Sequence, residues 1–559
     1  MKPDLKTRHG GRILADALAA QGVKMAFGVP GESYLPVLDG LHDLRGRLSF
    51  IVCRQEGGAS YMAEAHGKLT GEPGVLLVTR GPGATNGAIG VHTGFQDSTP
   101  MVVFIGQVGN EFAEREAFQE MDYRRMYGQM AKWVAQIDRV ERIPEYVSHA
   151  FHTATAGRPG PVVLALPEDT LFAEAAVADV PRHHTVRPSA SAQEMREVQK
   201  LLQSAQRPFV LLGGGGWTGE ACRKLQSWIE KAGLPLGTSF RCQDLFDNRS
   251  PAYTGDVGIG INPKLAQRVK QADVLLVIGA RLGEMTTGAY TLVQAPVPQQ
   301  TLVHVHAGAE ELGRVYRPAL AINSGYPQFV EALEKIQLNG AWKDETAKAR
   351  QEYLEWTEPR PMPGALQYGQ LIRWLSDRLP EDTIVAGGAG NFAGWLHRHF
   401  RYKGFRTQLG PANGSMGYGY PAAVAAKLAQ PQRNVIAVCG DGDFLMNGQE
   451  MATAAQYGAA FVALVVNNGL YGTIRMHQER EYPARVFGTE LKNPDFAAYA
   501  RAFGGHGETV ERTEDFAPAF ERAQASRKPA LIELRIDPDA ITPATTLSAI
   551  REKALTSKR

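Results

Sequence analysis

Short apolar runs typical of buried strands alternate with amphipathic helical runs along the whole chain, and this alternation restricts the fold more than any other feature. The apolar runs include GVLLV, MVVFI, VVLAL, FVLL, VLLVI, TIVAG, NVIAVC, FVALVV and ALIEL. Successive parallel strands need crossover connections, which are usually helices, so strands alternating with helices indicate parallel sheets with helices on their faces. We therefore predict the α/β fold class.

The alternation falls into three blocks, which predict three consecutive α/β domains with parallel sheets flanked by helices. The first covers residues 1–182 and ends where FAEAAVADVPRHHTVRPSASAQ loses its periodicity and gathers Pro and Ser. The second covers residues 190–340 and is followed by GAWKDETAKARQEYLEWTEPRPMPGAL, which has the composition of a charged linker. The third covers residues 365–545, and a length of 559 residues accommodates all three.

The overall charge and the cysteines restrict the partners and the setting. Lys plus Arg is 60 against Asp plus Glu 58, so nothing favours nucleic acid or an anionic membrane as a partner. The N-terminus lacks the apolar core of a signal peptide, and no apolar run is long enough to span a bilayer. The four cysteines form no CxxC pair. These features predict a cytoplasmic protein.

The segment GDGDFLMNGQEMATAAQYGAAFVALVVNNGLYG, residues 440–472, predicts a cation site. A strand before it, a helix over FLMNGQEMATAAQYG and the strand AFVALVV would form one crossover unit, which brings Asp441 and Asn468 to the same edge of the sheet. Carboxylate and amide oxygens suit magnesium or calcium, and phosphate oxygens commonly complete such a site. Gly440 and Gly442 let backbone amides approach an anion. The segment therefore predicts a metal-bridged diphosphate.

A GDG turn paired with NN across one crossover is the thiamine-diphosphate signature. The chain also contains RQEGGASYMAEAHGKLTGEPG, AFQEMDYRRMYGQMAKWV and LGPANGSMGYGYPAAVAAKLA. With these stretches it resembles the thiamine-diphosphate-dependent acetolactate synthase family over nearly its whole length. The resemblance implies a pyruvate-decarboxylase-like architecture. In it the first domain binds the cofactor's pyrimidine, and the third binds its diphosphate and Mg²⁺.

The resemblance also assigns roles to single residues. Glu56 falls on the glutamate that bonds the aminopyrimidine N1′, and burial would give it the raised pKa that proton transfer favours. Asp441, Asn468 and the Leu470 carbonyl would bind the cation. The cofactor contacts would be Gly390, Asn391, Phe392, Gly414, Met416, Gly440, Gly442, Asp443 and Gly472.

Phe118, Gln119 and Lys132 align with residues that line the family's substrate channel. In this family the first domain of one chain meets the third domain of another. The resemblance therefore implies a homodimer with shared active sites, or a tetramer, that acts on small 2-oxo acids, aldehydes or ketones.

Departures from the family lie where substrate choice is made. His477 stands in the place of a Trp, and Met285 in the place of an Arg that reads the carboxylate of the second keto acid. Glu32 replaces a Gly that faces the reacting centre and could act as a second acid or base. Glu32 and His477 are both candidate catalytic residues. Arg80 replaces a more usual Ser, and Gln55 replaces a His before Glu56.

The second block leaves two questions open. LLGGGGW is a lone glycine turn after a strand, a weak nucleotide signal, and acetolactate synthases hold FAD in this domain. His304 and His306 stand where an Asp-bearing turn is common, which argues against FAD. The two histidines share one face of a strand and could be metal ligands, but a structural role is favoured because no third ligand has suitable spacing.

The resemblance implies a 2-oxo acid decarboxylase and carboligase, in which the cofactor ylide and then an enamine react with carbonyl groups. Two alternatives remain within the same chemistry. One is a carbon–carbon lyase or hydrolase that acts on an acyloin or diketone, and the other is an FAD-linked 2-oxo acid oxidase. Retention of Glu56, Asp441 and Asn468 argues against a non-catalytic regulator.

Overall fold

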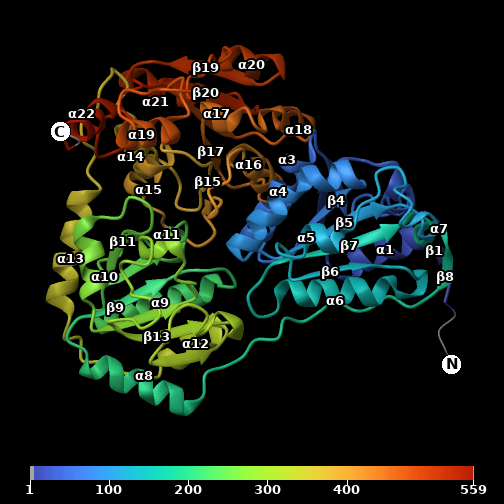
Figure 1. Cartoon of the computed structure of the whole chain (residues 1–559), viewed down its shortest axis with the longest axis horizontal. Helices are drawn as coiled ribbons and strands as arrows, with labels where there is room; N and C mark the ends of the chain where they lie inside the picture. The colour runs from blue at the N-terminus through green and yellow to red at the C-terminus, as the bar shows by residue number, and fades with distance from the viewer. Residues whose placement is uncertain (1–4, 558–559) are drawn as a thin grey trace. The chain divides into compact units, whose positions relative to one another are not determined.

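The computed structural model describes residues 5–557 and contains three six-stranded sheets in which all neighbouring strands run parallel (Figure 1). Helices flank each sheet, so the α/β prediction is confirmed. One compact unit contains the first sheet, and another contains the second and third sheets. The exact domain boundaries given above stay a prediction.

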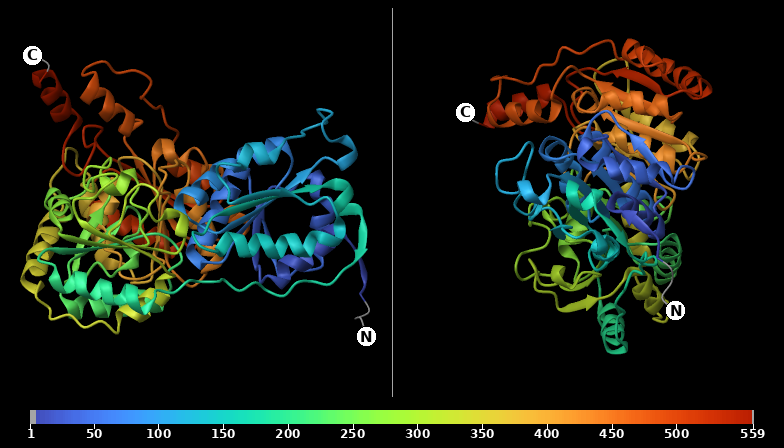
Figure 2. Two further views of the ribbon diagram at one scale, coloured as in Figure 1. Left: turned by 60° about the horizontal axis from the view of Figure 1, so that its bottom comes forward. Right: turned by 90° about the vertical axis from the view of Figure 1, so that its right-hand side faces the viewer.

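The first sheet has the order β3-β2-β4-β5-β7-β6. Its strands are β2 (Met25–Gly28), β3 (Ser49–Val52), β4 (Gly74–Val78), β5 (Met101–Gln107), β6 (Trp133–Gln136) and β7 (Pro161–Pro167). Alternate residues of β4 face opposite sides: Val75 and Leu77 pack with α1 (Gly10–Ala20) and α6 (Ile143–Thr155), whereas Leu76 and Val78 face α4 (Gly81–Asp97). The helix α3 (Glu56–Thr70) packs against α4 (Figure 1 and Figure 2).

The second sheet has the order β11-β10-β9-β12-β13-β14. Its strands are β9 (Pro208–Leu212), β10 (Leu236–Ser239), β11 (Tyr253–Val257), β12 (Val274–Ile278), β13 (Thr301–His306) and β14 (Leu320–Asn323). The helices α9 (Gly219–Ala232) and α12 (Tyr326–Leu333) share one hydrophobic core with it, and α10 (Pro263–Gln271) packs into a second core.

The third sheet has the order β16-β15-β17-β18-β20-β19, which repeats the order of the first sheet. Its strands are β15 (Ile384–Gly387), β16 (Gln408–Leu409), β17 (Val435–Gly440), β18 (Val462–Asn467), β19 (His506–Val510) and β20 (Ala530–Arg535). The helices that share its core are α14 (Tyr368–Arg378), α15 (Ala393–His399) and α21 (Thr513–Ala525). The opposite face contacts α16 (Gly419–Ala429) through Cys439.

The predicted charged linker contains a helix, which corrects one expectation. The helix α13 (Lys343–Trp356) buries Thr346, Ala349 and Tyr353, and Trp342 just before it is also buried. These residues recur at helical spacing and form a narrow apolar stripe, while charged residues cover the remaining surface. The high charge of the segment hid this stripe.

The single helix predicted after GDG is also wrong. The structure instead has α17 (Asp441–Phe444), a 3₁₀ turn over Gly448–Glu450 and α18 (Met451–Gln456). The break falls at the sequence Met446-Asn447-Gly448, where Asn447 donates its side-chain amide to the Gly417 carbonyl at 3.0 Å. Asn and Gly are weak helix formers, so a tertiary hydrogen bond replaces the helix here.

Candidate functional site

The strands β17 and β18 are parallel neighbours, and their carboxyl ends bring Asp441 and Asn468 to one edge of the third sheet, as predicted. The Asp441 carboxylate is buried and accepts hydrogen bonds from the Gly442 and Gly469 amides, both at 2.9 Å. Burial raises its pKa above the usual value, and these hydrogen bonds oppose that shift. The carboxylate is therefore held in a fixed orientation at the end of β17.

Asn493 also holds Asp441, a contact that no motif in the sequence predicts. Its side-chain amide donates to Asp441 Oδ2 at 2.8 Å and to Asn467 Oδ1 at 2.9 Å. Asn493 lies 52 residues beyond Asp441 in a segment without regular structure. Only the folded chain brings the two together.

The donors at this edge suit a hard cation. Asp441 contributes a carboxylate, Asn468 an amide oxygen and Leu470 a backbone carbonyl, and all three line one cavity. Within residues 5–557, no group of three His, Cys, Asp or Glu side chains could hold a metal ion by itself. The set fits a magnesium ion whose remaining ligands come from phosphate oxygens.

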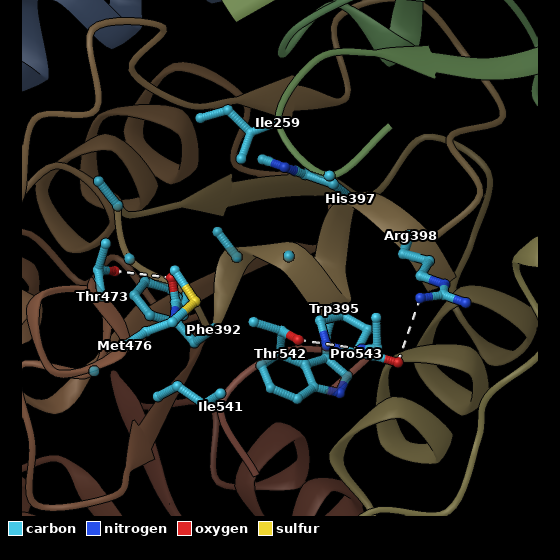
Figure 3. Close-up of a pocket in the computed structure, with 18 of the residues that line it drawn as sticks. Ile259, Phe392, Trp395, His397, Arg398, Thr473, Met476, Ile541, Thr542 and Pro543 are labelled. Atoms are coloured by element: carbon cyan, nitrogen blue, oxygen red, sulfur yellow. Dashed lines mark hydrogen bonds between the residues drawn. The ribbon is translucent and has the colours of Figure 1, made fainter. Parts of the chain in front are cut away.

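The cavity has a volume of about 740 Å³ and lies within the unit formed by the second and third sheets (Figure 3). Every cofactor and cation residue predicted in the third block lines it: Gly390, Asn391, Phe392, Gly414, Met416, Gly440, Asp441, Gly442, Asp443, Asn468, Leu470 and Gly472. The structure therefore brings together residues that are far apart in the sequence.

Glycines make room for backbone and ligand at this site. A Cβ on Gly440 would come within 2.8 Å of the Phe392 ring. Gly414 has a φ of 70° and no atom within 4 Å of where its Cβ would stand, so its backbone faces open space. Thr473 donates to the Asn391 side-chain oxygen at 3.0 Å and orients that amide. This arrangement fits a bound diphosphate.

Asp443 acts on the loops around the cavity. Its Oδ1 accepts from the Gly417 amide at 2.8 Å and from the Ala389 amide at 3.2 Å. Its Oδ2 is buried and has no hydrogen-bond partner within the described part of the chain. Burial raises the pKa of Asp443 to about 6. The carboxylate thus ties the β15 turn to the loop that carries Gly414 and Met416.

His477 is not among the residues that line the cavity. It occupies an exposed position on α19 (Gly472–Glu481), whereas Thr473, Ile474, Met476 and Arg480 of the same helix do line it. Thr473, Ile474 and Arg480 lie three or four positions from His477, so the helical repeat places His477 on the same side of α19 as these residues. The role of His477 at the site stays a prediction.

At the carboxyl edge of the first sheet, Glu56 begins α3 and accepts a hydrogen bond from Asn86 Nδ2 on α4 at 3.0 Å. Gln55 caps the same helix by accepting from the Gly57 and Gly58 amides. Glu56 is half-buried within the single chain. Gln119 and Asn86 line one shallow pocket beside it.

Arg80 holds the segment that carries Phe118 and Gln119. Its guanidinium donates to the Phe118 carbonyl at 3.2 Å and pairs with Glu168, while Glu32 lies 3.7 Å away with an exposed side chain. The Gly81 amide donates to the Gln119 carbonyl at 3.0 Å. Gln119 has a φ of 65°, a strained value for a side-chain-bearing residue. Arg80 therefore shapes the predicted substrate-channel segment.

Lys132 does not lie with these residues, so its placement in the channel is corrected. Its ammonium group donates to the Thr153 and Ala156 carbonyls, both at 2.6 Å, at the end of α6. Its own amide donates to the carbonyl of Pro161, the first residue of β7. Lys132 thus lies at the amino edge of the first sheet, opposite the edge where Glu56 lies, and caps a helix.

At the turns after β9 and β12 the carboxyl edge of the second sheet is packed with protein, whereas the carboxyl ends of β10 and β11 border the cavity described above. A Cβ on Gly214 would stand 2.3 Å from the Gly279 carbonyl, so the glycine turn after β9 is explained by packing against the turn after β12. Trp217 stacks on Tyr326 with ring centroids 4.9 Å apart, and both are buried.

The two histidines of β13 have structural roles. His304 Nε2 lies 2.9 Å from the Ala280 carbonyl, and His306 Nδ1 lies 3.0 Å from the Gly308 amide. Both are buried, and burial lowers the pKa of His304 to about 4. Met285 is partly exposed on α11 (Glu284–Thr287). Packing therefore explains the glycine turn after β9 without a bound nucleotide.

Comparisons with known proteins agree with this arrangement. Three family models match the chain: the N-terminal TPP binding domain of thiamine pyrophosphate enzymes over residues 8–126, the central domain over 195–333 and the C-terminal TPP binding domain over 388–534. Within residues 5–557, no helix has the length and apolar character required to cross a membrane.

Curated relatives match over nearly their whole length. The chain is 30% identical to the acetolactate synthase isozyme 2 large subunit of Escherichia coli, covering 95% of this chain and 96% of that protein. It is 30% identical to a probable acetolactate synthase large subunit of Methanocaldococcus jannaschii, covering 96% and 93%. It is also 30% identical to the acetolactate synthase large subunit of Lactococcus lactis, covering 89% and 88%.

Proposed function

The chain belongs to the acetolactate-synthase-like family of thiamine pyrophosphate enzymes, and we propose that it is a 2-oxo acid decarboxylase and carboligase. The observation that carries the proposal is the cavity at the edge of the third sheet, where hard cation donors and glycine-rich turns meet. Thiamine diphosphate, when bound, supplies a carbon nucleophile that adds to a carbonyl carbon and accepts the electrons left after carbon dioxide departs.

The residues of the third sheet hold the cofactor in this proposal. Asp441, Asn468 and the Leu470 carbonyl would hold Mg²⁺, with phosphate oxygens as its further ligands. The turn at Gly390 and Asn391 contacts the diphosphate through backbone and amide groups. Met416 contributes an apolar wall that keeps water from the reacting centre.

Residues of the first sheet manage protons and substrate. The Glu56 carboxyl group exchanges a proton with the aminopyrimidine ring nitrogen, and Asn86 holds that carboxyl group in place by its 3.0 Å hydrogen bond. Gln119 and Phe118 border the substrate, with Arg80 fixing their backbone. Two copies of the chain form a homodimer with shared sites, a proposal supported by the family resemblance.

The experiment combines purified protein with thiamine diphosphate, Mg²⁺ and pyruvate, and records carbon dioxide and acetolactate. Glu56→Gln should keep its cofactor affinity and lose about a hundredfold or more of its turnover, because general acid–base groups contribute about 10²–10⁴-fold. Glu72→Gln, an exposed glutamate paired with Arg182, is the matched control and should keep full activity.

The products separate the alternatives. Acetolactate supports carboligation between two 2-oxo acids, whereas carbon dioxide alone indicates a different acceptor. If neither product forms while the cofactor binds, acyloins and diketones are tested next as substrates for cleavage. Equal activity of Glu56→Gln and wild type would overturn the assignment.

A further inference from the structure

One end of the cavity carries two polar side chains that the proposed cofactor contacts do not use. Asp256 lies on β11, the edge strand of the second sheet, and His397 lies on α15 beside the third sheet. Both line the cavity together with Phe240 and Ile259. Figure 3 shows His397 and Ile259 close to each other on its wall. The His397 ring meets the Phe240 ring edge-on, with centroids 5.3 Å apart.

Neither side chain is satisfied by the protein. Asp256 Oδ1 is buried without a hydrogen-bond partner among residues 5–557. No side-chain hydrogen bond is formed by the His397 ring within the same residues. Most buried polar groups in folded proteins find a partner, so the open Asp256 oxygen, in the same cavity as an unbonded His397 ring, indicates a place for a ligand.

Their protonation suits an uncharged ligand. Burial raises the pKa of Asp256 to about 7, with Arg241 opposing the shift. Burial and the nearby Arg241 lower the pKa of His397 to about 3, so its ring is neutral at pH 7 and offers one donor and one acceptor. Asp256 contributes a carboxyl group that accepts a hydrogen bond and, when protonated, donates one.

Two guanidinium groups of the cavity wall donate to backbone carbonyls. Arg241 donates to the Gly388 carbonyl at 2.8 Å and to the Gly387 carbonyl at 3.3 Å. Arg398 donates to the Trp356 carbonyl at 2.7 Å and to the Pro543 carbonyl at 3.3 Å, and it stacks on the Trp356 ring at 3.7 Å. Arg398 Nη2 is buried without a hydrogen-bond partner within residues 5–557. Both cations help to hold the cavity walls.

Apolar side chains surround the polar pair. Phe240, Ile259, Ile261, Leu265 and Trp356 line this end of the cavity. Such walls favour a hydrocarbon body, because apolar side chains exclude water from it and offer no hydrogen bonds of their own.

We propose that Asp256 and His397 form a subsite for the oxygen atoms of an uncharged apolar hydroxyketone or aldehyde. The His397 ring N–H donates to the carbonyl oxygen, and the Asp256 carboxyl group accepts from the hydroxyl. An α-hydroxyketone carries both groups, so it satisfies both side chains at once. This inference rests on the proposed function and names its second substrate as an uncharged carbonyl compound, with an acyloin as product.

The test measures binding instead of turnover. Wild-type protein loaded with thiamine diphosphate and Mg²⁺ is titrated with 2-hydroxy-1-phenylpropan-1-one and, separately, with phenylglyoxylate, which carries a carboxylate. Quenching of tryptophan fluorescence reports binding, because Trp356 and Trp395 line the cavity. The hydroxyketone should bind more tightly than phenylglyoxylate.

Variants then locate the site. Asp256→Leu and His397→Leu should each weaken hydroxyketone binding about tenfold, the loss expected for one hydrogen bond left unmade. Asp256→Asn and His397→Gln retain a hydrogen-bonding group and should recover most of the affinity. Asp39→Leu and His42→Leu, both at exposed positions, are the matched controls. A thermal melt shows that each variant is folded.

The outcomes distinguish the two proposals. Unchanged hydroxyketone binding in both Leu variants, or tighter binding of phenylglyoxylate, would overturn the subsite. Cofactor affinity within twofold of wild type in these variants supports a subsite separate from the diphosphate residues. A chain that binds no thiamine diphosphate counts against the proposed function, and hydroxyketone titration without cofactor still decides the subsite.

Discussion

The second and third sheets both follow a buried strand with a glycine-rich turn, yet only one turn borders a cavity. At the carboxyl end of β17, Gly440 and Gly442 flank Asp441, and the same cavity is lined by Asn468 and Leu470 just after β18. After β9, Gly214 packs directly on the Gly279 carbonyl, and aromatic side chains fill the edge beyond. A glycine turn thus indicates a ligand when the next strand also ends in ligating groups, and otherwise serves close backbone packing.

The largest expected effect is on cofactor binding, and it follows from removing the Asp441 carboxylate, which has no counterpart at the glycine turn of the second sheet. Asp441→Ala should weaken Mg²⁺-dependent binding of thiamine diphosphate by about a hundredfold or more, because even groups that only support a metal ligand are worth about 10–100-fold. Isothermal titration with Mg²⁺ and cofactor measures the change. Asp247→Ala, which removes an acid paired with Arg249 away from the cavity, should bind as wild type does. Equal binding in both variants would remove the distinction between the two turns.

Two glycines with nearly the same backbone conformation sharpen the comparison. Gly214 has a φ of 72° and Gly414 a φ of 70°, but only Gly214 lacks space for a Cβ. Gly214→Ala should lower the free energy of unfolding by about 3 kcal/mol, from backbone strain and the clash together. Gly414→Ala should lower it by about 1 kcal/mol, from backbone strain alone.

The two variants should rank the other way for cofactor affinity than for the free energy of unfolding. Gly414→Ala places a methyl group in the cavity and should weaken binding, whereas folded Gly214→Ala should bind normally. Urea unfolding and cofactor titration on both variants measure the two effects. If only Gly214→Ala weakened cofactor binding, the turn that binds the cofactor would belong to the second sheet and not to the third.

The helix α19 lines the cavity at the third sheet, and an ion pair with α22 holds it in place. Glu479 of α19 is buried and accepts from Arg551 Nε at 2.8 Å and Nη2 at 2.6 Å, on α22 (Leu547–Ser557). Arg551→Gln should lower the free energy of unfolding by about 2 kcal/mol at pH 7, less than for a fully buried pair because Arg551 is partly exposed.

The effect of Arg551→Gln should depend on pH with a definite sign. The hydrogen bond from Arg551 lowers the pKa of Glu479 from 4.5 to about 2, so the pair stabilises the fold above pH 4.5. The difference between wild type and variant should shrink as pH falls toward 2. Urea unfolding at several pH values measures it, with Arg512→Gln, whose partner Glu514 is exposed, as the control. A difference that grows with acid would contradict this reading.

The smallest expected effect concerns the histidines of the second sheet. His304→Gln should lower the free energy of unfolding by about 1 kcal/mol, the worth of one hydrogen bond. Added Zn²⁺ should leave the melting temperature of wild type and variant unchanged, because both histidines are already bonded to backbone groups. A zinc-dependent rise confined to the wild type would show that the second sheet carries a metal site after all.

The positions of site residues at the two ends of one strand–helix–strand crossover could be predicted from the sequence. The positions of residues that depend on contacts between distant parts of the chain could not. Asp441 and Asn468 follow from strand order alone, because neighbouring parallel strands end at the same edge. Asn493 was missed because it comes from an irregular segment. Lys132 was misplaced because alignment gives a position along the chain but not the edge of the sheet to which the side chain turns.

The sequence by itself determined the α/β class, the thiamine-diphosphate family and the donors at the third sheet, because strand periodicity and short motifs are local. Tertiary structure alone decided that the glycine turn of the second sheet is packed and that Asp256 and His397 line the same cavity. Burial and hydrogen-bond satisfaction depend on residues far apart in the chain, and no local pattern records them.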